Sequence, residues 1–181
     1  GESSSDVFSF VTPLNKPTNV TAYKTNLYPG DETTISWEEA AGATSYNVYV
    51  GENKVAENVE GTSYQLSELA YNITGHNITV TANHTLGESA KSDAVVVKVA
   101  GTFPLTVNVK DSKGNPIGGA TVTFNTSSAL DEFQNTITAP EALTTNAEGV
   151  AEIILPLIYN DPNTFGEQII VYANKTPFKE N

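Results

Sequence analysis

Apolar and polar residues alternate with a period of two in short segments along most of the chain. In the segment TTISWEEA, Ile35 and Trp37 fall on one side. In the segment TSYNVYVG, the residues on one side are Tyr46, Val48 and Val50. Such alternation is typical of β-strands with one buried face, and Gly, Asn, Asp and Pro separate the segments as turn residues do. The pattern therefore predicts an all-β protein in which these two strands face each other across a core.

A boundary between two domains is predicted in the stretch VAGTFPL. There, Gly101 and Pro104 separate a valine-rich segment from a new alternating one. The chain has 181 residues, which is enough for two β-sandwiches of ordinary size. We therefore expect two tandem β-sandwiches, at residues 16–100 and 101–181, preceded by an extended N-terminal arm at residues 1–15.

The first domain resembles a fibronectin type III domain in the order and spacing of its segments. Pro17, Val20 and Ala22 stand on the first strand, Trp37 stands on the second, and Gly87–Ser89 closes the last hairpin. The resemblance implies a sandwich of the immunoglobulin-like class.

The sequence departs from this family at the start of the sixth strand, where members usually have a corner tyrosine. Here His76 precedes the alternating residues Ile78, Val80 and Ala82. We expect the imidazole to replace the phenol as a hydrogen-bonding group, because a half-buried polar ring normally finds a partner. A metal site formed with His84 is the alternative, but eight residues of extended strand span roughly 26 Å.

The second domain resembles the bacterial Ig-like repeats of invasin- and intimin-type surface adhesins. The stretch LTVNVKDSKGNPIGGATVTF contains a D-x-x-G-x-P turn between two alternating strands, and TTNAEGVA begins a later strand. Asn146 stands where many members have Asp. The alternating apolar residues on either side of the first turn are Leu105, Val107, Val109, Val122 and Phe124. Members of this family are binding and spacer modules, so the resemblance implies no catalytic residues.

Composition narrows the range of functions further. The net charge is −12, which argues against nucleic acid as a partner because phosphate binding requires clustered cations. There is no Cys, which excludes disulfides and thiolate chemistry, and the acidic pairs in DETT, WEEA and ALDEF lie beside no nucleophile or base. The turns DSKGN and YNDPN leave Ca²⁺ open as an alternative, although neither has regular calcium-loop spacing. We expect no enzymatic activity, no cofactor and no metal.

Further patterns point to the cell exterior. No apolar run approaches the roughly 20 residues of a transmembrane helix. Six N-x-[ST] sequons are candidates for N-glycosylation, and they suit an extracellular glycoprotein, although a chain of this composition would yield about three or four by chance. The candidate asparagines are Asn19, Asn72, Asn77, Asn83, Asn125 and Asn174. Tyr23, Tyr28 and Tyr49 form no recognisable sugar platform, and we expect them to pack at sheet edges.

The two ends of the chain suggest how it is used. The stretch GEQIIVYA predicts a strand with Ile169, Val171 and Ala173 on one face, yet the residual NKTPFKEN does not provide the closing strand that this family normally has. The N-terminal stretch DVFSFVTP is apolar, rich in β-formers and surplus to the first sandwich. We expect it to act as a donor strand that pairs with the edge formed by those three residues. The donor residues are Val7, Phe8, Ser9, Phe10 and Val11, with both phenylalanines on one face.

These expectations together predict a subunit of an extracellular cell-surface filament. Donor and acceptor lie at opposite ends of the chain, so the contact generates a head-to-tail homopolymer. With two β-domains and many sequons, this architecture resembles the archaeal filaments called threads and suggests a role in adhesion, with a cell-surface or carbohydrate receptor as a further partner. The alternative is a surface adhesin or spacer module that does not polymerise and binds protein or carbohydrate.

Overall fold

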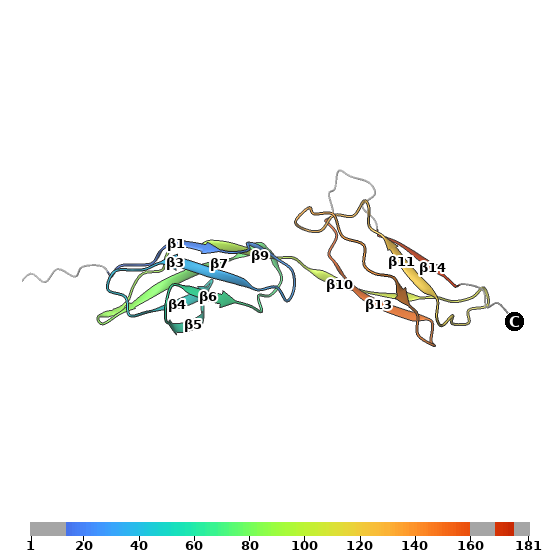
Figure 1. Cartoon of the computed structure of the whole chain (residues 1–181), viewed down its shortest axis with the longest axis horizontal. Coiled ribbons are helices and arrows are strands. Elements are labelled where there is room, and N and C mark those ends of the chain that lie inside the picture. The colour runs from blue at the N-terminus through green and yellow to red at the C-terminus, as the bar shows by residue number, and fades with distance from the viewer. Residues whose placement is uncertain (1–13, 160–168, 176–181) are drawn as a thin grey trace, which may run out of the picture. The chain divides into compact units, whose positions relative to one another are not determined.

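The computed structural model describes residues 14–159 and 169–175 (Figure 1). These residues form strands, turns and loops without a helix, so the predicted all-β class is confirmed. The chain divides into two compact units, with Lys98 in unit 1 and Val99 in unit 2, while the short segment Leu69–Ile73 also belongs to unit 2. The predicted donor strand, Val7–Val11, lies outside the described residues.

Unit 1 is built on two antiparallel sheets. The smaller sheet has the strand order β1-β3-β6, and the larger has the order β2-β9-β7-β4-β5, with β8 paired to β7. The strands are β1 (Thr18–Ala22), β2 (Asn26–Leu27), β3 (Thr33–Glu38), β4 (Ser45–Val50), β5 (Asn53–Val59), β6 (Ser63–Leu66), β7 (Asn72–His84), β8 (Gly87–Glu88) and β9 (Val95–Val99).

The core of unit 1 lies between these sheets, as the alternating pattern predicts. Ile35 on β3 and Val48 on β4 are each 0% exposed, although the two strands belong to different sheets. The rings of Trp37 and Tyr46 meet edge to face with their centroids 5.3 Å apart. The prediction that these two strands face each other across a core is therefore confirmed. Val50 is half-buried and lies at the margin of that core.

Unit 2 contains two smaller sheets (Figure 1). One is the pair β10 (Thr102–Asn108) and β13 (Val150–Pro156), which are antiparallel along their whole length. The other has the order β12-β11-β14, with the short strand β12 and the longer strand β14 on either side of β11. The bounds of these three strands are Leu143–Thr144 for β12, Thr121–Asn125 for β11 and Ile170–Asn174 for β14.

The turn after β10 is held by the side chain of Asp111. Its Oδ1 accepts hydrogen bonds from the backbone N–H groups of Lys113 and Asn115, both at 2.8 Å, and its Oδ2 accepts one from Asn115 Nδ2 at 2.9 Å. Gly114 follows with a φ of 86°, a backbone conformation that glycine adopts at little cost. The bonds from Asn115, followed by the other backbone bonds, lower the pKa of Asp111. The carboxylate is thus engaged within an ordinary turn.

Asn146 builds the same turn before β13. Its Oδ1 accepts hydrogen bonds from the N–H groups of Glu148 at 3.1 Å and Val150 at 2.9 Å, and Gly149 has a φ of 72°. An amide oxygen therefore accepts these hydrogen bonds at a position where many members of the resembled family have a carboxylate. The substitution preserves the turn because only an acceptor is required.

A third turn of this kind, around Asp131, was not predicted. The Asp131 Oδ1 accepts hydrogen bonds from the N–H groups of Phe133 at 2.8 Å and Asn135 at 2.9 Å. Gln134 takes the position of glycine with a φ of 63°. The spacing D-x-x-x-N, shared with Asp111 and Asn115, was the available signal in the sequence. This signal was overlooked because the turn has no glycine at the residue with positive φ.

Candidate functional site

Among the described strands, β14 stands at an edge of its sheet in unit 2. It pairs antiparallel with β11, placing Val171 opposite Phe124 and Ala173 opposite Val122. Within residues 14–159 and 169–175, no other strand pairs with β14. Ile169 directly precedes the strand, so the three residues of the predicted acceptor edge fall on or beside one edge strand. Whether that edge accepts a donor strand remains a prediction.

Among the described residues, many of the apolar side chains that meet between the two sheets of unit 2 are only partly buried. The core cluster contains three buried residues, Val122, Phe124 and Ala151. The partly buried hydrophobic residues packed against it are Leu105, Val107, Val109, Leu143, Ile153, Ile169 and Val171. Val122 is 0% exposed, as fully buried as Ile78 and Val80 in the core of unit 1, so the partial burial concerns the margin of the unit 2 core. Within the described residues, the margin of the unit 2 core therefore keeps apolar surface that a further element would bury favourably.

A hollow lies over the β10–β13 pair of unit 2. It has a volume of about 480 Å³. Leu105 and Ile153, which are directly opposed across the two strands, contribute to it. Ile154 also contributes and is 69% exposed. Ile153 and Ile154 are neighbours on β13 and so point to opposite faces of the strand. The hollow therefore shows accessible apolar side chains of β10 and β13.

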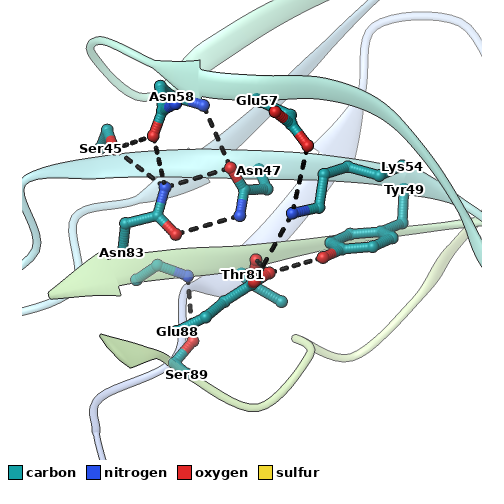
Figure 2. Close-up of polar contacts among 11 residues, drawn as sticks. Ser45, Asn47, Tyr49, Lys54, Glu57, Asn58, Thr81, Asn83, Glu88 and Ser89 are labelled. Atoms are coloured by element: carbon teal, nitrogen blue, oxygen red, sulfur yellow. Dashed lines mark hydrogen bonds and ion pairs between the residues drawn. The ribbon is translucent and has the colours of Figure 1, made fainter. Parts of the chain in front are cut away.

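A network of amide groups covers part of the larger sheet of unit 1 (Figure 2). Asn47 and Asn83 exchange hydrogen bonds at 3.0 and 3.1 Å through their side-chain amides. Asn83 Nδ2 also lies 2.9 Å from Ser45 Oγ and 3.2 Å from Asn58 Oδ1. Asn83 is one of the six sequon asparagines, and in this fold its amide nitrogen is committed to neighbouring acceptors. Sequence spacing alone gave no sign of this network.

The remaining sequon asparagines lie in different environments. Asn19, Asn77, Asn125 and Asn174 are exposed, whereas Asn72 is partly buried. Exposure is the property that a modifying enzyme requires of a folded substrate. The four exposed asparagines are therefore better candidates than Asn83, although glycosylation of any of them remains a prediction.

Glu88 on β8 lies at the centre of a polar cluster on the same sheet (Figure 2). Its Oε1 accepts hydrogen bonds from Tyr49 Oη at 2.6 Å and Thr81 Oγ1 at 2.5 Å, and Lys54 Nζ lies 3.6 Å from its Oε2. The bond from Thr81, followed by that from Tyr49, lowers the pKa of Glu88 to about 2. These contacts tie the short β7–β8 hairpin to β4 and β5.

Glu88→Gln should change how the stability of unit 1 depends on pH. The folded pKa of about 2 lies below the ordinary value of 4.5, so the charged carboxylate stabilises the fold above pH 4.5. That contribution is lost as the pH falls towards 2. The variant should therefore lose less stability than the unaltered protein across this interval. Denaturant unfolding followed by fluorescence of the single tryptophan, Trp37, measures the effect.

The exposed carboxylate of Glu52 provides the matched control for this experiment. Its side chain is 94% exposed and pairs with Lys91 at 2.8 Å. Exposed pairs of this kind contribute little to stability. Glu52→Gln should therefore keep the acid dependence of the unaltered protein, and an equal change in both variants would contradict the role assigned to Glu88.

The two histidines lie far apart along one strand. His76 is in the first half of β7 and is half-buried, whereas His84 ends the strand. The His84 Nε2 lies 2.9 Å from the backbone oxygen of Asn15. Among the described residues, no group of three or more His, Cys, Asp or Glu side chains is placed to hold a metal ion. A search of the same residues for a helix able to span a membrane also finds none.

Tyr23 differs from the expectation that it packs at a sheet edge. Its side chain is 83% exposed. It lines a hollow of about 490 Å³ together with Thr21, Ala22, Thr34 and Ser36. The tyrosine follows the last residue of β1, and its backbone N–H still donates to the oxygen of Thr34 on β3 at 2.9 Å, yet its ring remains exposed. The expectation was wrong for this residue.

Comparisons with known proteins find solved structures that are similar to this chain, but they do not assign it to a family. No protein-family model matches the chain, and a search of curated proteins gives no match. An Fn3-like protein from Clostridium thermocellum is similar to it, with 24% identity over 50% of this chain and 97% of that one, at a TM-score of 0.41.

Two further solved structures are similar over most of the chain. The three N-terminal domains of the bacteriophage RB49 outer capsid protein Hoc match 80% of it at 11% identity and a TM-score of 0.36. The Bacteroides ovatus protein SGBP-B, in complex with a mixed-linkage heptasaccharide, matches 78% at 14% identity and a TM-score of 0.30. The chain spans 59% and 46% of the length of these two proteins. At such levels the similarity carries no functional argument.

Proposed function

We propose that this protein is a structural subunit of an extracellular cell-surface filament. In this proposal, Val7–Val11 of one subunit inserts as a β-strand beside β14 in unit 2 of the next. The observation that carries it is the incomplete burial at the margin of the unit 2 core, where, among the described residues, seven hydrophobic residues remain partly buried around a cluster of three buried ones. The pairing of β14 with β11 alone, among the described strands, supports it.

Strand addition explains both features together. A strand beside β14 would hydrogen-bond to the backbone groups of the edge that faces no described strand, and alternate side chains would enter the space between the sheets. Phe8 and Phe10 are two residues apart and so share one face. Burying each ring contributes about 1.5–3 kcal/mol, and each ladder hydrogen bond adds about 0.5–1.5 kcal/mol. These gains oppose the cost of ordering the arm and joining two chains.

The location of donor and acceptor determines the form of the assembly. The donor precedes β1, the first strand of unit 1, in the sequence, whereas the acceptor belongs to unit 2. One subunit therefore uses different surfaces towards its two neighbours, and such a heterologous contact need not close into a ring. We propose a head-to-tail homopolymer outside the cell, carrying N-linked glycans and serving adhesion without catalysis or a cofactor. Such an assembly would resemble archaeal threads.

The hollow beside Tyr23 favours a second candidate function. An exposed tyrosine next to the hydroxyl groups of Thr21, Thr34 and Ser36 offers an aromatic face and hydrogen-bonding groups without charge. This combination suits a neutral carbohydrate. In this alternative the protein is a surface adhesin or spacer module that does not polymerise and contacts a glycan through unit 1.

Removal of the arm tests the filament proposal. Deleting residues 1–12 should abolish polymers while unit 1 stays folded, because the donor strand is absent. Phe8→Asp combined with Phe10→Asp should have nearly the same effect, since charges would enter an apolar groove. Full-length chains refolded together from denaturant would be examined by electron microscopy and analytical ultracentrifugation.

Ser9→Asp is the matched control for the charged arm. It adds a charge to the same strand on the opposite face from the phenylalanines, so polymers should still form. If the unaltered chain remains monomeric after refolding, or polymerises without residues 1–12, the filament proposal is wrong. The adhesin or spacer module then takes its place.

A further inference from the structure

From the point at which the chain enters unit 1, we infer a second contact between subunits. The end of unit 1 beside Leu14, with Leu86 at its tip, packs against unit 2 of the same neighbouring copy that holds Val7–Val11. This inference rests on the proposed function, which it extends from an inserted strand to a docked surface. Its partner is a second copy of this chain.

The first described residues are fixed to the β7–β8 hairpin and the loop after β3. The backbone oxygen of Asn15 lies 2.9 Å from His84 Nε2, and Asn15 Nδ2 donates to the oxygen of Ala41 at 3.1 Å. The Leu14 side chain lies beside Gly87, with its Cδ1 3.9 Å from the position of a Cβ at that glycine. The point where the arm leaves unit 1 is therefore set by contacts on both sides.

The short connection between arm and unit 1 limits where a neighbour can lie. Val11 and Leu14 are three residues apart, and a fully extended chain spans at most about 3.6 Å per residue, or roughly 11 Å in total. A unit 2 that holds the donor strand must therefore approach the end of unit 1 that carries Leu14. Chain length therefore keeps this end of unit 1 within roughly 11 Å of the residue that ends the donor strand.

Leu86 is the apolar group that this surface offers. It lies in the turn between β7 and β8, next to Gly87, and its side chain is 87% exposed. A single exposed leucine is common on protein surfaces, so its location decides the argument. The turn residues Thr85–Gly87 and the loop residues Ala41–Ala43 carry no charge. Each copy has a net charge of −12, so two copies repel each other. The repulsion is smallest where the contact is made by uncharged residues such as these.

Site-specific photo-crosslinking in assembled full-length chains tests this contact. The photoreactive residue p-benzoylphenylalanine would replace Leu86 in one variant and Tyr23 in a matched control. Tyr23 is 83% exposed and follows the opposite end of β1 from the arm. Position 86 should give crosslinked dimers and longer ladders, with peptides of unit 2 attached, whereas position 23 should give monomers. Mass spectrometry identifies the attached peptides.

Leu86→Ser provides a second readout that does not depend on photochemistry. Because the side chain is exposed in the monomer, unit 1 should stay folded and polymers should still form through the arm. Loss of one buried leucine contact should speed the dissociation of chains by roughly tenfold or more. Dilution followed by light scattering measures this rate.

The outcomes separate this inference from the proposed function. Polymers that require the arm but crosslink equally at positions 86 and 23, or dissociate at an unchanged rate with Leu86→Ser, overturn the second contact and leave strand insertion standing. Polymers that form without residues 1–12, or no polymers at all, overturn both. Crosslinks from position 86 to unit 2 together with faster dissociation support the inference.

Discussion

Trp37→Ala should lower the free energy of unfolding of unit 1 by about 3–5 kcal/mol. The indole is 6% exposed and packs edge to face on Tyr46, so it joins the two sheets at the centre of the core. Removing it leaves a cavity that strands held by ladder hydrogen bonds cannot readily fill. Denaturant unfolding of the full chain, followed by circular dichroism and by amide signals of unit 1, measures the loss.

Trp37→Phe is the matched variant for this prediction. It keeps an aromatic ring in the same space and removes the indole N–H, for which the described residues provide no acceptor. A buried donor without a partner costs about 1–3 kcal/mol, so its removal offsets part of the lost packing. We expect Trp37→Phe to cost clearly less than Trp37→Ala. Equal losses would contradict this account, and a loss below about 1 kcal/mol for Ala would show that Trp37 does not hold the core.

The period of two explains why much of unit 1 could be predicted. Ile35, Trp37, Tyr46 and Val48 were placed inside because alternate residues of a strand share a face, and all four are buried. No property of single strands, however, predicts which polar side chains meet across a sheet. The Asn47–Asn83 pair joins residues that are distant in sequence, and its geometry depends on the register between β4 and β7. It could not be predicted for that reason.

In unit 2, local sequence predicted one turn and missed another with the same geometry. The turn at Asp111 was recognised because glycine marks the residue with positive φ, whereas Gln134 occupies that position in the turn at Asp131. Tertiary contacts of the buried Asp131, which is 3% exposed, hold a conformation that glutamine alone would rarely adopt. The partial burial of Leu105 and Val171 could not be predicted from local sequence either. Alternation indicates which face of a strand is apolar, but it does not indicate how fully other elements cover that face.

Supplying the donor strand within the same chain should stabilise unit 2 and prevent polymerisation. In this variant a copy of residues 6–12 follows Asn181 through a flexible glycine–serine linker, and the native arm is deleted. The added strand meets β14 as an intramolecular partner at a high effective concentration, so the cost of joining two chains is avoided. We expect unit 2 to gain several kcal/mol, since two buried phenylalanines alone contribute about 3–6 kcal/mol before ordering costs.

Hydrogen exchange measures the result at the edge itself. Amides of β14 that face no strand within the described residues should become protected, and analytical ultracentrifugation should show a monomer. A second variant carries the same fused strand with both phenylalanines replaced by Asp, which keeps length and linker but cannot fill an apolar groove. If the two variants show equal protection at the β14 amides that point away from β11, the fused strand does not occupy the core. If the phenylalanine variant alone is protected, Phe8 and Phe10 are the side chains that complete unit 2.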